Sequence, residues 1–246
     1  MGQEKEEYKN KANWDKFLPG LAIDCVIVGY HERELKILIM EYENTDLYAL
    51  PGGFIEKDED LDKAASKVLK ERTGLKDIYL SQFHTFGRHD RSDTDAMKIV
   101  MENNDIKYDE NHWLLRRFVS VGYVALVDYK AVAPTPGIMS SKCTWFDLDS
   151  IPTLIQDHRE IIDEALLYLR NHVDNKLLGA NLLVDTFTMK DLQKLHETIL
   201  GEKLHRTGFH RKMMDSGHLK RLGKKKTGKA HRSPYLYRFV TENDMD

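Results

Sequence analysis

The stretch LPGGFIEKDEDLDKAASKVLKERTGL, residues 50–75, contains the pattern that decides the fold of this 246-residue chain. Small or aliphatic side chains recur within it with the spacing i, i+3, i+4, i+7 and i+8, at Leu61, Ala64, Ala65, Val68 and Leu69. This spacing predicts an amphipathic helix, because it places these side chains on one helical face. Gly74 stands where a glycine usually ends a helix, and the preceding Leu50-Pro51-Gly52-Gly53 predicts a loop.

Segments rich in aliphatic and β-branched residues surround this helix and predict the strands of a sheet. These segments are 21–30, 35–42, 118–129 and 144–146. A second amphipathic helix is predicted over 157–173, where Asp157 is expected to act as the N-cap. The alternation of strands and helices predicts an α/β or α+β domain over residues 17–178.

Two segments depart from this alternation. Residues 1–16 are polar and of mixed charge, without the apolar core of a signal peptide, so we expect a polar N-terminal tail. Residues 92–112 are polar and acidic apart from a short apolar island, and they predict a long surface insertion. A lid over a binding site is the alternative interpretation of this second segment.

The composition is typical of a globular, cytoplasmic protein. Hydrophobic residues make up 41% and charged residues 31% of the chain, which excludes a wholly disordered protein. No apolar run approaches the roughly 18 residues that cross a bilayer, so we expect no membrane partner. Two cysteines, Cys25 and Cys143, are too few for a disulfide framework, and a reducing compartment fits them best.

The net charge of −3 averages two parts of opposite sign. Residues 186–240 contain 14 Lys and Arg against 4 Asp and Glu, a net charge of +10, which leaves −13 for the rest of the chain. Such asymmetry indicates a basic module with a polyanionic partner, joined to a domain without one. A basic face that contacts only solvent is the alternative for a charge run by itself.

The basic segment 186–240 predicts two helices and a hairpin. Thr188 and Asp191 form a capping-box pattern for the first helix, which is expected to end at Gly201. A second helix is predicted over 206–216, and two strands joined by a basic, glycine-containing loop follow it. Helix, turn, helix and basic-tipped hairpin in this order predict a C-terminal winged helix-turn-helix domain that binds double-stranded DNA.

The second helix and the hairpin provide the predicted DNA contacts. With Phe209 and Met213 turned toward the core, Thr207 and Arg211 project from the opposite face, which enters the major groove in such domains. Arginine can donate two hydrogen bonds to guanine, whereas flexible lysines suit phosphates. The candidate DNA-binding residues are Arg206, Thr207, His210, Arg211, Lys212, Lys224, Lys225, Lys226, Lys229 and Arg232. A protein-interaction domain and an RNA-binding module are the alternatives.

The stretch at 50–75 resembles the Nudix box, which reads G, five residues, E, seven residues, then R-E-U-x-E-E-x-G-U with U aliphatic. Six positions match in register: Gly53, Glu59, Leu69, Glu71, Gly74 and Leu75. In Nudix hydrolases the carboxylates of this helix hold magnesium against a pyrophosphate. Here the three carboxylate positions are Val68, Glu71 and Arg72, and Lys67 replaces the box arginine.

These departures predict that the protein is not an enzyme. One carboxylate of three is left, and Arg72, which is always charged, stands where the cation would bind. We therefore expect no catalytic residue, no metal site and no cofactor. An active Nudix hydrolase with an accessory basic module is the alternative.

A degenerate Nudix domain followed by a winged helix resembles the Nudix-related transcriptional regulators, over nearly the whole chain after Trp14. The resemblance includes His84-Thr85-Phe86-Gly87 with Asp90-Arg91, the run 118–123, and Phe209-His210-Arg211-Lys212. It implies a Nudix-type α/β/α sandwich with a mixed sheet. It also implies a homodimeric regulator whose Nudix domain binds a small effector that alters the affinity for operator DNA. We expect a repressor and keep an activator as the alternative.

Two effector classes occur in this family, ADP-ribose and pentose sugars such as L-arabinose. The run Lys67-Val68-Leu69 is more similar to the sugar-responsive branch, so we expect a pentose sugar and keep ADP-ribose as the alternative. The candidate effector-binding residues are Glu59, Glu71, Phe86, Arg88, Asp90, Arg91 and Tyr123. An ordinary salt-bridged loop is the alternative for 88–91.

Overall fold

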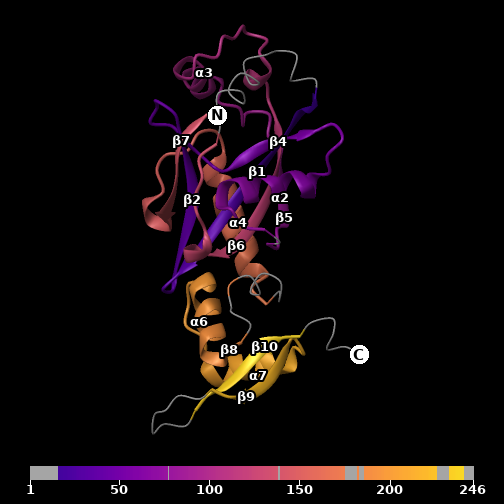
Figure 1. Ribbon diagram of the computed structural model, residues 1–246, viewed down its shortest axis with the longest axis vertical. Helices are drawn as coiled ribbons and strands as arrows, with labels where there is room; N and C mark the ends of the chain where they lie inside the picture. Colours follow the sequence, from indigo (N-terminus) through magenta and orange to yellow (C-terminus); the bar gives the residue numbers. More distant parts are fainter. Residues whose placement is uncertain are drawn as a thin grey trace.

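The computed structural model describes residues 16–76, 78–137, 139–174, 182, 186–225 and 233–240. They form an α/β/α sandwich with a mixed sheet and, below it in Figure 1, a winged helix, in agreement with the predicted fold class. The first domain contains β1 (Phe17–His31), β2 (Glu34–Tyr42), β3 (Tyr48–Ala49), β4 (Gly52–Glu56), α2 (Leu61–Thr73), β5 (Ser81–Phe86), α3 (Thr94–Asn103), β6 (Val119–Asp128), β7 (Ser140–Asp147) and α4 (His158–Asn171). The second contains β8 (Phe187–Thr188), α6 (Met189–Leu200), α7 (Arg206–Asp215), β9 (Leu219–Lys224) and β10 (Tyr235–Phe239).

Strand β1 is the centre of the large sheet. It pairs antiparallel with β2 and β4 and parallel with β6, while β5 extends the sheet beyond β6 and both β3 and β7 pair with β2. Ile23, Cys25 and Ile27 pack into the core on the α2 side, whereas Val26 and Val28 pack on the α4 side. Because alternate side chains of a strand point to opposite faces, covering both faces explains the continuous apolar run in the sequence.

Helix α2 forms where the periodicity predicts it, and Gly74 ends it with a left-handed φ of 73°. The prediction of a loop at Gly52-Gly53 is wrong, because these residues begin β4 and pair with β1. A Cβ atom at Gly52 would lie 2.7 Å from the Ile23 carbonyl oxygen. Glycine therefore permits this close pairing of backbones, although it usually indicates a turn.

The prediction of a surface insertion at 92–112 is also wrong in part, because this segment contains α3. Met97 and Val100 of α3 are buried in a small apolar cluster with Leu114. The buried residues of α3 extend only from Ala96 to Met101, which is too short a periodic signal to predict a helix from sequence.

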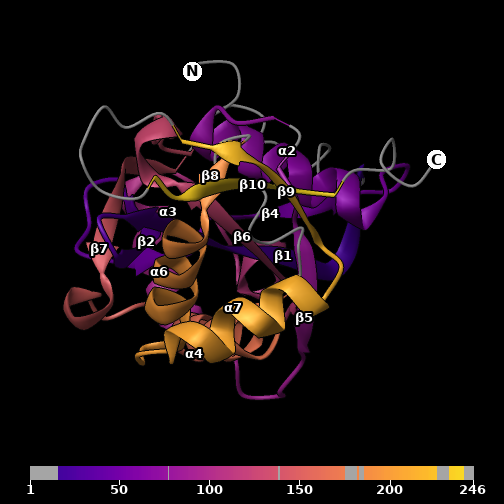
Figure 2. The same cartoon turned by 90° about the horizontal axis from the view of Figure 1, so that it is seen from below.

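The winged helix has the predicted order of elements, and β8, β10 and β9 form its three-stranded sheet (Figure 2). Thr188 and Asp191 form the capping box of α6, and Gly201 ends that helix. Phe209 and Met213 of α7 are buried, as the sequence predicts.

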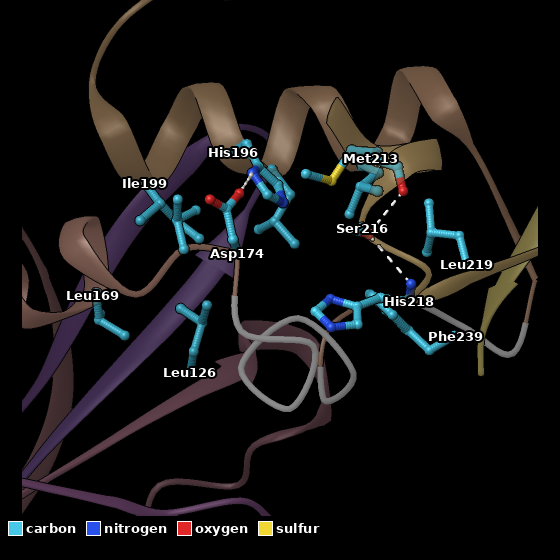
Figure 3. Close-up of a pocket in the computed structure, with 13 residues that line it drawn as sticks. Leu126, Leu169, Asp174, His196, Ile199, Met213, Ser216, His218, Leu219 and Phe239 are labelled. Carbon is cyan, nitrogen blue, oxygen red and sulfur yellow. Dashed lines mark hydrogen bonds and ion pairs between the residues drawn. The ribbon is translucent and has the colours of Figure 1, made fainter. Parts of the chain in front are cut away.

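Helix α6 joins the two domains. Its Leu195 and Ile199 are buried in the same core as Leu126 of β6 and Leu169 of α4. Figure 3 shows Ile199, Leu126 and Leu169 around the junction. A shared apolar core fixes α6 against the first domain. None of the helices in the described part of the chain is long and apolar enough to cross a membrane.

Candidate effector cavity and DNA-binding surface

A cavity of about 150 Å³ lies in the first domain, between the sheet, α3 and the start of α4. Its polar lining residues include Asp24, Arg72, Arg91, Ser140, Gln156 and His158. Its apolar lining residues include Phe54, Met97, Leu114, Phe118 and Met139. A concave apolar site with a few convergent polar groups is the usual form of a small-molecule site.

A buried ion-pair network forms one wall of this cavity. Arg91, with only 3% of its side chain exposed, donates to both carboxylate oxygens of Asp157 at 2.8 Å and to the Phe118 carbonyl at 2.8 Å. Its guanidinium also lies 3.6 Å from Asp24, which accepts a 2.6 Å hydrogen bond from Ser120. A buried arginine with this many acceptors holds a fixed geometry.

His158, the first residue of α4, adds an uncharged polar group to the cavity. Its Nδ1 accepts a 3.0 Å hydrogen bond from the backbone N–H of Leu50, which leaves the proton on Nε2. Nε2 lies 3.6 Å from Asp24. Burial lowers the pKa of His158 below its ordinary value, although Asp24 and Asp157 act in the opposite direction. The cavity therefore contains a neutral imidazole that can donate one hydrogen bond.

Sequence reasoning missed part of this network. Asp24 is a single charged residue within an apolar strand, and that signal marks a buried functional or paired carboxylate. Asp157 occupies the predicted N-cap position of α4, but its side chain makes no capping hydrogen bond and binds Arg91 instead.

Among the seven predicted effector-binding residues, Arg91 lines the cavity. Arg88 and Asp90 lie instead on an open surface hollow, where they pair at 2.9 Å, and Arg88 also contacts Glu160 at 3.3 Å. The hydrogen bond from Arg88 lowers the pKa of Asp90 to about 2. These two residues therefore form the salt-bridged loop that was the alternative prediction.

The other predicted effector-binding residues lie apart from one another. Phe86 is buried in the core on the α4 side of the sheet. Tyr123 is buried on the α2 side, where its hydroxyl donates to Asp62 at 2.7 Å and burial raises its pKa. Glu59 and Glu71 pair with cations of α2, so the structure does not bring the seven residues together.

The residues of α2 do not fit the divalent cation of a Nudix hydrolase. The ammonium of Lys67 lies 3.2 Å from Glu56 and 3.7 Å from Glu59, and the guanidinium of Arg72 lies 3.8 Å from Glu71. No group of three or more His, Cys, Asp and Glu side chains suited to a metal occurs in the described ranges. Cations of the protein itself thus occupy the carboxylates that would bind magnesium.

The predicted DNA-binding residues of α7 lie on its exposed face, opposite Phe209 and Met213. These residues are Arg206, Thr207, His210 and Arg211. Lys212 differs, because its ammonium lies 2.5 Å from Asp174, which follows α4. Exposed Lys224 and Lys225 lie at the end of β9. The predicted contacts at Lys226, Lys229 and Arg232 lie outside the described residues.

A groove of about 650 Å³ extends this basic surface toward the first domain. Arg206 and His210 share it with Lys190 and Lys194 of α6 and with Arg33 from the turn between β1 and β2. Sequence reasoning missed Arg33, because nothing local indicates that this turn lies beside the winged helix.

Residues 18–165 match the model of the NUDIX domain family, which is more than half of the chain. The chain belongs to the Nudix family. Residues 179–239, which include α6, α7 and the β9–β10 hairpin, match the model of the NrtR DNA-binding winged helix domain. The Nudix domain and the DNA-binding domain thus follow each other in the order that the sequence predicts.

The relatives of this chain include a transcriptional repressor and a pyrophosphatase. The ADPR responsive transcriptional repressor NtrR of Acinetobacter baylyi is 29% identical over 232 residues, which are 92% of this chain and 84% of that protein. The structure of Shewanella oneidensis NrtR has a TM-score of 0.66 and 28% identity, and covers 89% of this chain and 94% of its own. The ADP-ribose pyrophosphatase of Methanocaldococcus jannaschii is 26% identical over 60% of this chain and 73% of its own.

Shewanella oneidensis NrtR has also been crystallised with a 27mer DNA. That complex has a TM-score of 0.66 and 27% identity to this Nudix protein, and covers 92% of this chain and 95% of its own. The likeness to a DNA-bound protein therefore extends over both domains.

Proposed function

We propose that this Nudix protein is a transcriptional repressor whose winged helix binds operator DNA and whose Nudix domain binds a small effector. One observation carries the proposal: α7 exposes Arg206 and Arg211, while α6 of the same winged helix is buried in the core of the domain that contains the effector cavity. The likeness to the NtrR and NrtR proteins supports it. Effector binding at the Nudix cavity can alter the affinity for DNA only if the conformation that binds DNA and the conformation that does not have different affinities for the effector.

ADP-ribose is the effector in this proposal. The pentose sugar expected from Lys67-Val68-Leu69 has no support in the relatives described above, because the names of the repressor and the pyrophosphatase refer to ADP-ribose. A ligand of drug size needs a pocket of roughly 300 Å³ or more. The cavity of about 150 Å³ therefore takes one end of ADP-ribose, and the rest of the ligand lies along its open side.

DNA binding with and without effector tests the proposal. Selection from random duplexes yields the operator, and fluorescence anisotropy measures its affinity with added ADP-ribose, L-arabinose or AMP. Allosteric coupling of about 1–3 kcal/mol corresponds to a change of about 5- to 150-fold, which we expect for ADP-ribose. Release by L-arabinose alone would restore the pentose hypothesis. Equal binding to a matched RNA duplex would instead favour an RNA-binding module.

The proposal includes a homodimer that does not hydrolyse its effector. A dimer would place two copies of α7 on two half-sites about one helical turn apart. Light scattering in solution measures the oligomeric state, and a monomer on the selected operator would contradict this part. Incubation with magnesium and ADP-ribose tests the second part, because rapid release of AMP that Glu71→Gln abolishes would show an active hydrolase.

A further inference from the structure

Arg72, near the end of α2, has a buried hydrogen-bond donor that meets no acceptor in the described part of the chain. Its side chain is only 12% exposed and lines the effector cavity. One terminal nitrogen donates to the Pro136 carbonyl at 3.1 Å. The Nε atom is buried and meets no hydrogen-bond acceptor among the residues that the structure describes. An unsatisfied buried donor lowers the free energy of unfolding, and a bound molecule that provides an acceptor removes this loss.

The positive charge of Arg72 is also weakly neutralised. Glu71 is its ion-pair partner within the described ranges, at 3.8 Å, and half of the Glu71 side chain is exposed. Arg91, the other guanidinium of the cavity, instead binds both oxygens of Asp157 at 2.8 Å. Arg72 is therefore the cavity's available cation for an anionic ligand.

The surrounding backbone fixes the position of Arg72. A Cβ atom at Gly137 would lie 2.9 Å from its terminal nitrogen, so the missing side chain at Gly137 leaves room for the guanidinium to rest against this loop. The same loop is tied to α2 by the backbone N–H of Thr135, which donates to the Arg72 carbonyl at 3.0 Å. A side chain held in this way loses little conformational entropy when it binds a ligand.

We propose that Arg72 binds the phosphate or diphosphate group of the effector in place of a divalent cation, so that effector binding requires no metal. Arginine binds phosphate through parallel N–H donors, and the Nε of Arg72 is a donor that no acceptor among the described residues satisfies. Arg72 stands where the Nudix box has a glutamate. The residue that replaces this carboxylate therefore also provides a cation that can bind the diphosphate. The inference rests on the proposed function, because ADP-ribose is the anionic ligand considered.

Calorimetric titration of ADP-ribose tests this inference. We expect the same dissociation constant for the full chain in EDTA and in magnesium, because Arg72 provides the positive charge. Arg72→Gln should weaken binding at least about tenfold, the usual result of losing a charge-assisted hydrogen bond. Lys70→Gln is the matched control, since it removes one positive charge from an exposed position of α2 and should leave the affinity unchanged. Equal affinities of these two variants, or loss of wild-type binding in EDTA, would overturn the inference.

Two further variants keep the test independent of folding. Arg72→Lys retains the charge but not the paired donors, and we expect an affinity between those of the wild type and Arg72→Gln. Arg72→Glu places a second carboxylate beside Glu71, and we expect any ADP-ribose binding by this variant to become dependent on magnesium. Binding by Arg72→Glu in EDTA with wild-type affinity would contradict a role for the guanidinium.

Inorganic pyrophosphate separates the anion site from the identity of the effector. If the wild type bound no ADP-ribose, the proposed effector would be wrong. Pyrophosphate binding in EDTA that is lost in Arg72→Gln would still support the anion site. A wild-type protein that bound neither compound would overturn it.

Discussion

The carboxylate of Asp174 lies 2.5 Å from the ammonium of Lys212, and this ion pair joins the Nudix domain to the helix that is predicted to enter the DNA groove. Asp174 also lies 3.8 Å from His196 of α6 (Figure 3). Asp174 follows α4, whose first residue, His158, lines the candidate effector cavity. Helix α4 thus connects the cavity to the DNA-binding domain. Figure 1 shows that α3, which also lines the cavity, lies at the end of the Nudix domain away from the winged helix.

Asp174→Asn should tighten DNA binding. Removal of the carboxylate frees the ammonium of Lys212 for a phosphate, so we expect a several-fold gain in affinity and a slope of log affinity against log salt that is steeper by about 0.9. Anisotropy titrations over a range of salt concentrations measure both quantities. Asp163→Asn, an exposed change on α4 at an ion pair with Arg159, should alter neither. An unchanged salt slope in Asp174→Asn would show that Lys212 stays away from the DNA.

Arg211→Ala and Lys225→Ala should differ in their effect on sequence preference. Arg211 lies on the exposed face of α7, where a bidentate contact with a base contributes about 1–3 kcal/mol of discrimination. Lys225 lies at the base of the wing and is expected to contact phosphate, which carries no sequence information. Affinities for the operator and for a scrambled duplex check this difference. If both variants lost the same factor on both duplexes, the assignment of α7 as the recognition helix would be wrong.

Arg91→Leu should strongly destabilise the Nudix domain. The substitution leaves Asp157 and Asp24 buried without their cation, and breaking a buried ion pair from one side costs about 3–5 kcal/mol. Urea unfolding followed by circular dichroism measures this loss. Arg88→Leu, in a pair that is about half exposed, should lower the free energy of unfolding far less than Arg91→Leu. Similar losses for the two variants would mean that the buried network contributes little stability.

The stability of the protein should fall on mild acidification, partly because of His196. Burial lowers the pKa of His196 to about 4, with Asp174 acting against this shift and Lys212 adding to it. An unfolded histidine has a pKa near 6.5, so the unfolded state binds more protons between about pH 6.5 and pH 4. The free energy of unfolding therefore falls as the pH falls through this window, by up to about 1.4 kcal/mol per pH unit from this group.

Urea unfolding at several pH values measures this dependence. His196→Gln should reduce the slope, whereas His210→Gln, on the exposed face of α7, should leave it unchanged. Burial also lowers the pKa of His158, so this residue contributes to the pH dependence of stability with the same sign. The test therefore compares the slopes of the variants with the slope of the wild type. An identical slope in the wild type and in His196→Gln would contradict the assignment.

Local sequence patterns were sufficient to predict an element wherever its signal lies within a few residues of the chain. The apolar stripe of α2, its end at Gly74 and the capping box of Thr188 and Asp191 all follow from short-range geometry, and the structure confirms them. The Nudix box could be recognised for the same reason, and so could its missing carboxylates. Helix α3 and strand β4 were not predicted, because their formation depends on packing against partners far along the chain.

Local patterns thus predict the two domains, their order, and the basic charge of the second. Long-range packing brings the polar residues of the cavity together, since Asp24, Arg91 and His158 come from three distant segments. The same packing places Lys212 beside Asp174 and leaves the Nε of Arg72 without an acceptor in the described part of the chain. Electrostatic contacts depend on distances of a few ångströms, which the packing sets and local patterns do not encode.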